Sequence, residues 1–347
     1  MRASSKRDEL SPRLHSLLLA AIHEFINTAQ PVGSHQLAAR RSLGIRAAMV
    51  RNLMAELDES GYLRQPHTSA GRVPTERAFR YYVDHVVLPP IRFADRTQIE
   101  LHYSAPVSDS MEMIRDTSRL LSLMTGQAAL IMAPRLESLQ LKQVQLLRLR
   151  EHEVLAIFVV ATGGVHSRLL RPDADYSQPD LDRMSGYLND SLGGRTLEQA
   201  HQWIEQQLQH ERALYDEITR AALVIGGELA RLPSSAEIYV EGSSKALDQP
   251  EFADPARLRE LLRALDDKTA LLDLLERALA QSELIVSIGS ENFDTRLAGL
   301  SVVASPYISG DHPLGSLAIV GPVRMDYQRV IPLVGYTARA LSRALQP

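Results

Sequence analysis

The sequence predicts an α+β protein in which a small helical front end precedes a larger body of strands and helices. Apolar residues recur at three- and four-residue steps within the first 60 residues, which is typical of amphipathic helices. From about residue 92 the composition shifts: a helix comes first, short strands follow from residue 128, a helical block interrupts them, and strands with β-branched residues then resume. The chain has 347 residues, of which 45% are hydrophobic, enough for two or three cores.

The composition excludes several classes of protein. Cysteine is absent, so the chain has no disulfide framework, thiolate nucleophile or cysteine-ligated metal site. No apolar run reaches the roughly 18 residues of a membrane span. The N-terminus is a poor signal peptide, because Asp8, Glu9 and Pro12 interrupt it. We therefore expect a cytoplasmic protein.

The sequence patterns of enzymes are also missing. The paired glycines lack the Lys-Ser/Thr of a phosphate-binding loop, and no G-x-S-x-G motif occurs. The 11 histidines occur singly, without the close spacing of a ligand pair. We expect no catalytic residues, no bound metal and no cofactor.

The charge is unevenly distributed along the chain. Residues 1–84 contain 12 Lys+Arg and 8 Asp+Glu, a formal charge of +4, whereas the remainder contains 26 and 34, a charge of −8. A positive front end on an acidic body suits a protein whose front end meets a polyanion. Chance fluctuation over so short a segment is the alternative explanation.

The front end is expected to contain three helices. Periodicity predicts the first over Ser11–Thr28, with Ser11 as its N-cap and Pro12 as its first helical residue. Ser34 is expected to cap a second, short helix that reaches about Arg41. Further along the chain, the segment from residue 46 to residue 60 is predicted to form the third helix.

The third predicted helix has the surface of a helix that enters the major groove. Its inward stripe is apolar and consists of Val50, Leu53, Met54 and Leu57. The opposite face begins with small or polar residues, including Ala48 and Asn52. Bulky apolar groups there would hold the helix away from base edges. A plain three-helix bundle with a solvated face explains the periodicity equally well.

A hairpin is expected directly after this helix. Tyr62–Gln65 alternates like a strand, residues 66–71 are rich in turn formers, and Arg72–Pro74 can return before a helix beginning near Thr75. Three helices followed by a hairpin with a polar, basic tip is the order of a winged helix-turn-helix. In that fold the third helix enters the major groove and the wing approaches the DNA backbone or minor groove.

Candidate DNA-binding residues follow from this interpretation. Asn52 can pair with adenine or bind the backbone, and Arg51 can read guanine or clamp a phosphate. The alternative for Arg51 is an ion pair with Glu56 or Asp58. His67 at the wing tip either contacts DNA or shapes the turn. The candidates are Ser34, His35, Arg46, Ala48, Met49, Arg51, Asn52, His67, Thr68, Ser69 and Arg72.

Several motifs resemble those of the HrcA family of heat-inducible transcription repressors. They are Pro31–Ser34, Val50–Leu57, Gly61–Leu63, Gln65–Thr75 (the most specific), Tyr81–Asp84 and, more weakly, Ser287–Glu291 and Gly321–Tyr327. The resemblance implies a homodimeric repressor of class I heat-shock operons. Such a repressor binds an inverted-repeat operator in double-stranded DNA upstream of chaperone genes, and the GroE chaperonin helps to keep it active.

The resemblance also implies a domain organisation. A winged-helix DNA-binding domain would occupy residues 1–84, and a GAF-like sheet domain would consist of residues 85–194 and 283–347. An inserted, largely helical dimerising domain would span residues 195–282. Within it, a Leu-rich helix is expected over Pro255–Ala280, whose Leu stripe is either core or dimer interface. We expect Pro306–Leu314 to be a surface loop.

The start of the third helix departs from the family's pattern. The family usually has Ser-Pro-Ala-Thr there, whereas this chain has Arg46-Ala47-Ala48-Met49. In the family's motif the Thr hydroxyl can reach a phosphate or a base. Here Arg46 can replace that contact electrostatically, and Met49 can touch a thymine methyl group. His35 stands where the family usually has a basic residue.

The alternative hypothesis for the function of the whole chain is a metabolite-responsive transcription regulator with a small-molecule site in the GAF-like domain.

Overall fold

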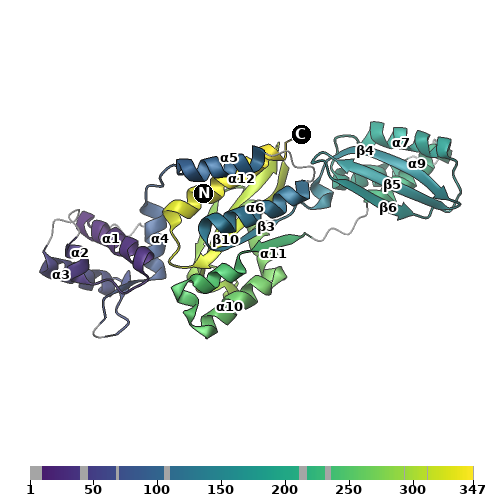
Figure 1. The fold of residues 1–347 in the computed structure, drawn as a ribbon. Helices are drawn as coiled ribbons and strands as arrows, with labels where there is room; N and C mark the ends of the chain where they lie inside the picture. Colours follow the sequence, from purple (N-terminus) through teal and green to yellow (C-terminus); the bar gives the residue numbers. More distant parts are fainter. Residues whose placement is uncertain are drawn as a thin grey trace.

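The computed structural model describes residues 10–39, 46–67, 70–104, 110–210, 217–230, 236–292, 294–310 and 312–346. These residues form an α+β fold of three units that lie in a row (Figure 1). We call them the N-terminal unit, the central unit with a five-stranded sheet, and the distal unit with a three-stranded sheet. No helix of the described residues is long and apolar enough to cross a membrane.

The N-terminal unit contains four helices and a short hairpin. Its elements are α1 (Pro12–Thr28), α2 (Ser34–Ala38), α3 (Ala47–Glu59), β1 (Leu63–Arg64), β2 (Val73–Pro74) and α4 (Glu76–His85). The side chain of Ser11 accepts a hydrogen bond from the Leu14 amide, which confirms the predicted cap of α1. Ser34 does not cap α2. The N-cap is Gly33, whose backbone is extended and whose carbonyl oxygen accepts the Leu37 N–H.

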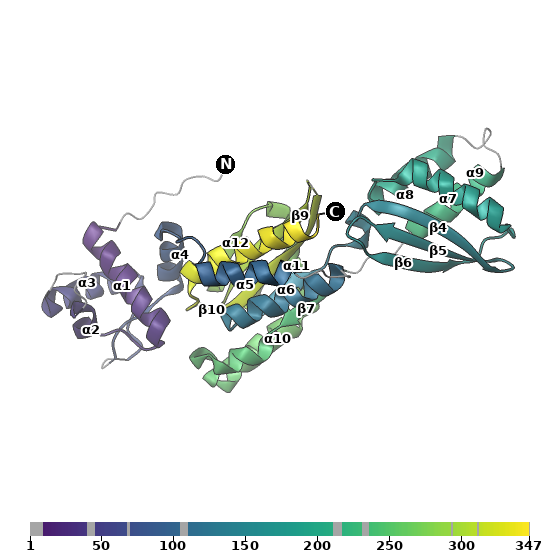
Figure 2. The ribbon, with the colours of Figure 1, turned by 45° about the horizontal axis from the view of Figure 1, so that its top comes forward.

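The central unit is a three-layer arrangement around an antiparallel sheet. The strand order is β7 (Ile238–Glu241), β3 (Ala128–Met132), β10 (His312–Pro322), β9 (Leu300–Ser309) and β8 (Ile285–Ile288). One face of the sheet is covered by α6 (Ser110–Thr125) and α12 (Tyr327–Ala344), and α5 (Phe93–Ser104) packs on α12. The other face is covered by α10 (Pro255–Asp266) and α11 (Lys268–Gln281) (Figure 2). Alternate residues of β3 join the two cores: Ala129 and Ile131 on one side, Leu130 and Met132 on the other.

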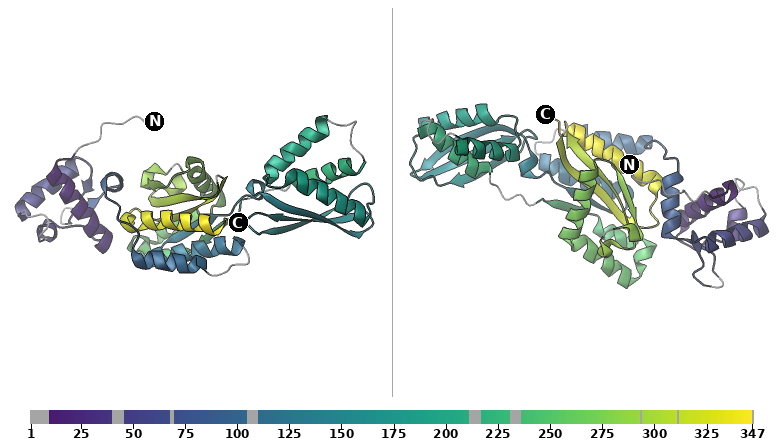
Figure 3. Two further views of the ribbon diagram at one scale, coloured as in Figure 1. Left: turned by 90° about the horizontal axis from the view of Figure 1, so that it is seen from above. Right: turned by 180° about the vertical axis from the view of Figure 1, so that it is seen from behind.

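The distal unit is inserted between strands β3 and β7. It contains β4 (Leu141–Arg150), β5 (Glu153–Val160) and β6 (Val165–Leu170), with α7 (Gln178–Leu192), α8 (Leu197–His210) and α9 (Glu217–Ala230) on one side of the sheet (Figure 3). The described 3₁₀ turns of the chain are Leu136–Ser138, Ser243–Asp248, Pro250–Ala253, Gly289–Glu291 and Thr295–Leu297.

The elements group differently from the expected domain division. We expected an insertion over residues 195–282, but β7 pairs with β3 and therefore returns the chain to the central sheet by residue 238. The strands of residues 141–170, expected in the GAF-like domain, instead form their own sheet under α7–α9. The inserted part thus contains a three-stranded sheet and is not largely helical.

Two local expectations also need correction. The single helix expected over Pro255–Ala280 is broken at Asp267, whose side chain accepts the Ala270 N–H and caps α11. Its Leu stripe faces the core of the central unit: Leu261, Leu265 and Leu275 are buried, and Leu258, Leu272 and Leu279 pack against them. The loop expected at Pro306–Leu314 is largely the paired end of the β9–β10 hairpin.

Candidate DNA-binding surface

Helix α3 has a buried face and an exposed face, as the sequence predicted. Val50, Met54 and Leu57 are buried against α1 and α2, while Leu53 is half-buried. On the other side, Ala48, Arg51 and Asn52 are exposed, and Met49 is 44% exposed. The burial follows from the 3.6-residue helical period, which directs the apolar stripe inward.

The first turn of α3 is open to an anion. Arg46 is the residue before the helix, is exposed, and makes no side-chain capping bond. Uncapped N–H groups at a helix start, together with the helix dipole, favour a negatively charged partner. On the neighbouring α2, which packs against α3, His35 is exposed and Ser34 is half-buried. The α2 and α3 candidates therefore lie on adjoining elements.

The hairpin is anchored to the loop between α1 and α2. The amide of Val32 donates to the Arg72 carbonyl over 2.8 Å, and the amide of Arg72 donates back to Val32 over 2.9 Å. A Cβ atom at position 71 would lie 2.4 Å from the Val32 carbonyl oxygen, so this approach requires Gly71. Gln65 Nε2 also donates to the Ala70 carbonyl over 3.1 Å and braces the base of the tip.

The tip itself is only partly described. His67 is exposed, in keeping with either of its two expected roles. Thr68 and Ser69, two further DNA-binding candidates, lie outside the described residues.

Arg72 is turned toward α3. Its Nε donates to Asp58 Oδ2 over 3.0 Å, and the two side chains are 18% and 31% exposed. The structure therefore gives Arg72 a role in holding the hairpin against α3. Asp58 is thereby engaged, and within the described part of the chain Arg51 makes no ion pair with Asp58 or Glu56. Arg51 keeps its guanidinium group available to a ligand.

We expect the Arg72–Asp58 pair to contribute to the stability of the N-terminal unit. Arg72→Ala and Asp58→Ala should each lower the free energy of unfolding by about 1 kcal/mol, because the pair is partly screened from water. The double variant should lose less than the sum of the single losses. Urea unfolding of the four proteins measures this coupling, and fully additive losses would contradict it.

Helix α4 joins the N-terminal unit to the central unit through polar bonds. The Glu76 carboxylate accepts the Ser290 backbone N–H over 2.9 Å and the Ser290 hydroxyl over 2.7 Å. Arg80 donates to the Val286 carbonyl and to Glu291 over 3.0 and 3.1 Å. A Cβ atom at position 289 would lie 2.1 Å from the Glu76 carboxyl group, so a residue other than glycine would displace this bond.

A second set of contacts lies beside the first. Phe79 and Tyr327 have ring centroids 6.1 Å apart. Arg324, whose side chain is 13% exposed, pairs with Glu251 and donates to the Ile26 carbonyl of α1. Burial, and then the nearby Asp326 carboxylate, raise the pKa of the Tyr82 phenol and keep it neutral. The sequence marks residues 287–291 and 321–327 only as motifs, and the structure places both against the N-terminal unit.

Comparisons with known proteins define the class of this chain. Residues 111–331 match the family model described as "HrcA protein C terminal domain". A Geobacter sulfurreducens protein named "Heat-inducible transcription repressor HrcA" is 39% identical over 339 residues, 97% of this chain and 99% of that protein. A protein of the same name from Syntrophobacter fumaroxidans is 37% identical over 341 residues, 97% of this chain and 98% of that protein.

One solved structure shares the whole fold. It is described as "Crystal structure of a hypothetical protein at 2.2 A resolution", and it covers 97% of this chain and 99% of its own with a TM-score of 0.63 and 22% identity. The relatives' function makes this chain a transcription repressor rather than an enzyme. With identities of this size along nearly its full length, the chain belongs to the HrcA family of heat-inducible transcription repressors.

Proposed function

We propose that the N-terminal unit is a winged helix-turn-helix that binds double-stranded DNA with α3 in the major groove. The observation that carries this proposal is the exposed face of α3. Small Ala48 lets the helix approach base edges, while Arg51 and Asn52 beside it offer hydrogen-bond donors. The hairpin from β1 to β2 follows α3 at once and would serve as the wing.

The candidate residues then take separate roles. Asn52 reads a base edge, Met49 contacts a thymine methyl group, and Arg51 binds guanine or phosphate. Arg46 and His35 would bind the DNA backbone beside α3, together with Ser34, and the wing tip would contact it through His67, Thr68 and Ser69. Arg72 supports the wing through Asp58. Because chromosomal DNA lies in the bacterial cytoplasm, the proposal places the protein there.

We propose further that two copies join through the uncovered face of the distal sheet. On β5, Val154, Ala156, Phe158 and Val160 are buried toward the helices, and the intervening residues lie on the opposite face. With their cross-strand neighbours they form what we call the open sheet face, which consists of Gln143, Gln145, Leu147, Leu155, Ile157, Val159, Val165, Ser167 and Leu169. All nine residues are uncharged.

The composition of the open sheet face suits a second copy of itself. Six of its members are aliphatic, and Val165 is 67% exposed in the single chain. Exposed apolar surface of this kind marks an interaction site. A two-fold axis through the face would make the contact self-complementary and would present two N-terminal units to two inverted half-sites.

The central unit completes the proposal as a GAF-like domain. Its five-stranded antiparallel sheet with helices on both faces supports this assignment. Large apolar side chains are exposed between α4 and α5 and on α5, namely Val87, Leu88, Phe93 and Leu101. They offer apolar surface to the GroE chaperonin, on which we propose the repressor's activity depends. Since folded domains are stable by only about 5–15 kcal/mol, mild heating can deplete the active form.

A gel-shift titration tests the proposed function. We expect a retarded complex with an inverted-repeat fragment from upstream of a chaperone operon, and much weaker binding to a scrambled duplex. If six to ten phosphates are contacted, raising the salt from 50 to 200 mM should lower the affinity about 10³- to 10⁵-fold. Mild heating should abolish the complex and GroE should restore it. Equal affinity for both duplexes would contradict sequence-specific repression.

A further inference from the structure

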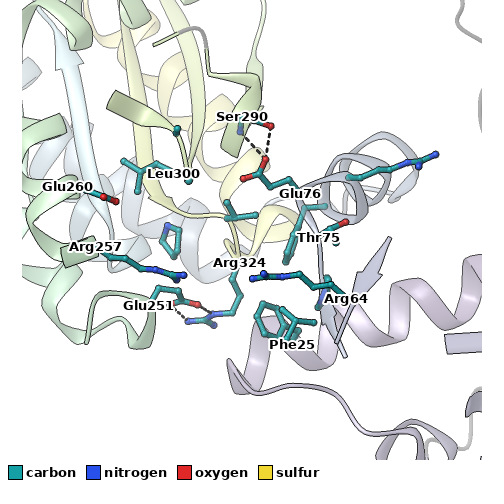
Figure 4. A pocket seen from close by; sticks show the side chains of 18 of the residues that line it. Phe25, Arg64, Thr75, Glu76, Glu251, Arg257, Glu260, Ser290, Leu300 and Arg324 are labelled. Carbon is teal, nitrogen blue, oxygen red and sulfur yellow. Dashed lines mark hydrogen bonds and ion pairs between the residues drawn. The ribbon is translucent and has the colours of Figure 1, made fainter. Parts of the chain in front are cut away.

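A cavity of about 710 Å³ lies between the N-terminal unit and the central unit. Figure 4 shows its walls: Phe25, Arg64 and Glu76 come from the N-terminal unit, while Glu251 and Arg257 come from the central unit. The volume is within the range of about 300–1,000 Å³ found for small-molecule sites, which also occur preferentially between domains. We call this cavity the interunit cleft.

The interunit cleft has a positive lining. Its charged residues are five arginines and three glutamates, namely Arg64, Arg77, Arg257, Arg296, Arg324, Glu76, Glu251 and Glu260. Much of this charge is already engaged, since Arg324 pairs with Glu251 and Arg296 pairs with Asp294. The remaining excess of positive charge favours an anionic occupant.

Among the described residues, two arginines of the cleft have guanidinium groups without a protein partner. Arg64 lies on β1 and Arg257 on α10, and Figure 4 shows them extending into the cleft from opposite walls. Within the described part of the chain, neither one forms an ion pair or a side-chain hydrogen bond. An ion placed between them would receive donors from both units.

We propose that the interunit cleft binds a small phosphorylated molecule, with a phosphate group held between Arg64 and Arg257. A guanidinium group presents paired N–H donors that match phosphate oxygens, and two such groups can neutralise a dianion. Phe25 and Phe252 on the same lining provide apolar surface for the remainder of the molecule. Nothing in this step depends on DNA binding.

Occupation of the cleft would act on the joint between the units. The ligand would contact both sides of the interface that the Glu76–Ser290 and Arg80–Glu291 bonds hold. It would therefore stabilise this placement of α3 relative to the central unit and change operator affinity by the same factor that the operator changes ligand affinity. This second step rests on the proposed function.

Thermal unfolding of the full-length protein tests the binding step, with inorganic pyrophosphate as the probe and sodium chloride holding the ionic strength constant. We expect a saturable rise in Tm. Arg64→Ala and Arg257→Ala should each weaken the apparent affinity about 10- to 100-fold, the loss expected for a hydrogen bond between charged groups. Arg259→Ala is the matched control, because Arg259 is an exposed arginine of α10 outside the cleft lining.

The alternatives give different results. Absence of a saturable shift, or an equal shift in Arg257→Ala and Arg259→Ala, would overturn the proposal. A non-operator duplex that stabilises the protein through Arg64 and Arg257, with no effect of pyrophosphate, would assign these arginines to the DNA backbone and also overturn it. Since the pyrophosphate measurement contains no DNA, its failure would leave the gel-shift result standing, and the reverse also holds.

Discussion

Replacement of Asn52 with alanine should lower operator affinity by about 1–3 kcal/mol for each half-site, which is about 5- to 150-fold per subunit. The reason is geometric: Asn52 is exposed on the face of α3 that also carries Ala48, so its amide can reach a base edge. The loss should be confined to one base pair of each half-site, where the variant becomes tolerant of substitutions. Fluorescence anisotropy with a panel of singly substituted operators measures both effects.

The control for Asn52→Ala is Asn27→Ala, which removes an exposed asparagine from α1. It should leave operator affinity unchanged. Arg51→Ala resolves the two roles left open for that residue. If Arg51 binds a phosphate, its loss should reduce the slope of log affinity against log salt concentration by about 1 for every DNA sequence. If Arg51 binds a guanine, its loss should relax the specificity at one base pair of the half-site. If Asn52→Ala and Asn27→Ala bind alike, α3 does not read bases through Asn52.

A charge on the open sheet face should separate the two copies. We expect Ile157→Asp to produce monomers, because burying an unpaired carboxylate in an apolar contact costs more than the contact gains. Binding to a full inverted repeat should fall about 10²- to 10⁴-fold with the loss of bivalency, while binding to an isolated half-site should not change. Sedimentation velocity and anisotropy with the two duplexes provide these values.

Two further variants keep this prediction testable. Val165→Asp changes a side chain that is already 67% exposed, so it should fold even if Ile157→Asp does not. Gln202→Asp places the same charge on an exposed position of α8, on the helix side of the distal unit, and should remain dimeric. A dimer that survives both Ile157→Asp and Val165→Asp would show that the copies meet elsewhere.

The features predicted well from the sequence are local ones. The period of the apolar stripe placed α3, Ser11 marked the start of α1, and turn residues between short strands placed the hairpin. Each depends on residues within about one helical turn or one hairpin, where backbone geometry restricts the choices. Whether the exposed residues of α3 read bases stays a prediction, since burial shows only that they are available.

The features missed from the sequence depend on distant partners. Strand β7 belongs with β3 because their backbones pair across an insertion of about 100 residues, and no periodicity reports such a pairing. The sequence did not predict helix α5. Its large apolar residues Phe93 and Leu101 are exposed, so they do not form a single inward stripe with the helical period. Prolines at 306 and 313 indicate a loop, yet they stand in the β9–β10 hairpin, which has a register shift after Pro313.

The candidate site shows the same limit. Arg72 stays a DNA-binding candidate, but the sequence did not predict that its Nε donates to Asp58 Oδ2, 14 residues earlier. Similarly, Arg64 and Arg257 come from different units and line the same cavity only in the folded chain. Charge and spacing identify a basic side chain, and the tertiary structure decides its partner.

The central claim is that the exposed face of α3 lies against the duplex, and site-directed cleavage tests it most directly. Since the chain has no cysteine, Ala48→Cys provides a single thiol for an iron–EDTA reagent on that face. The account predicts cuts centred within each half-site of the operator, and none from the same reagent on Arg259→Cys. Uncut operator in a saturated complex with labelled Ala48→Cys, or identical cuts from both positions, would contradict the placement of α3 in the groove.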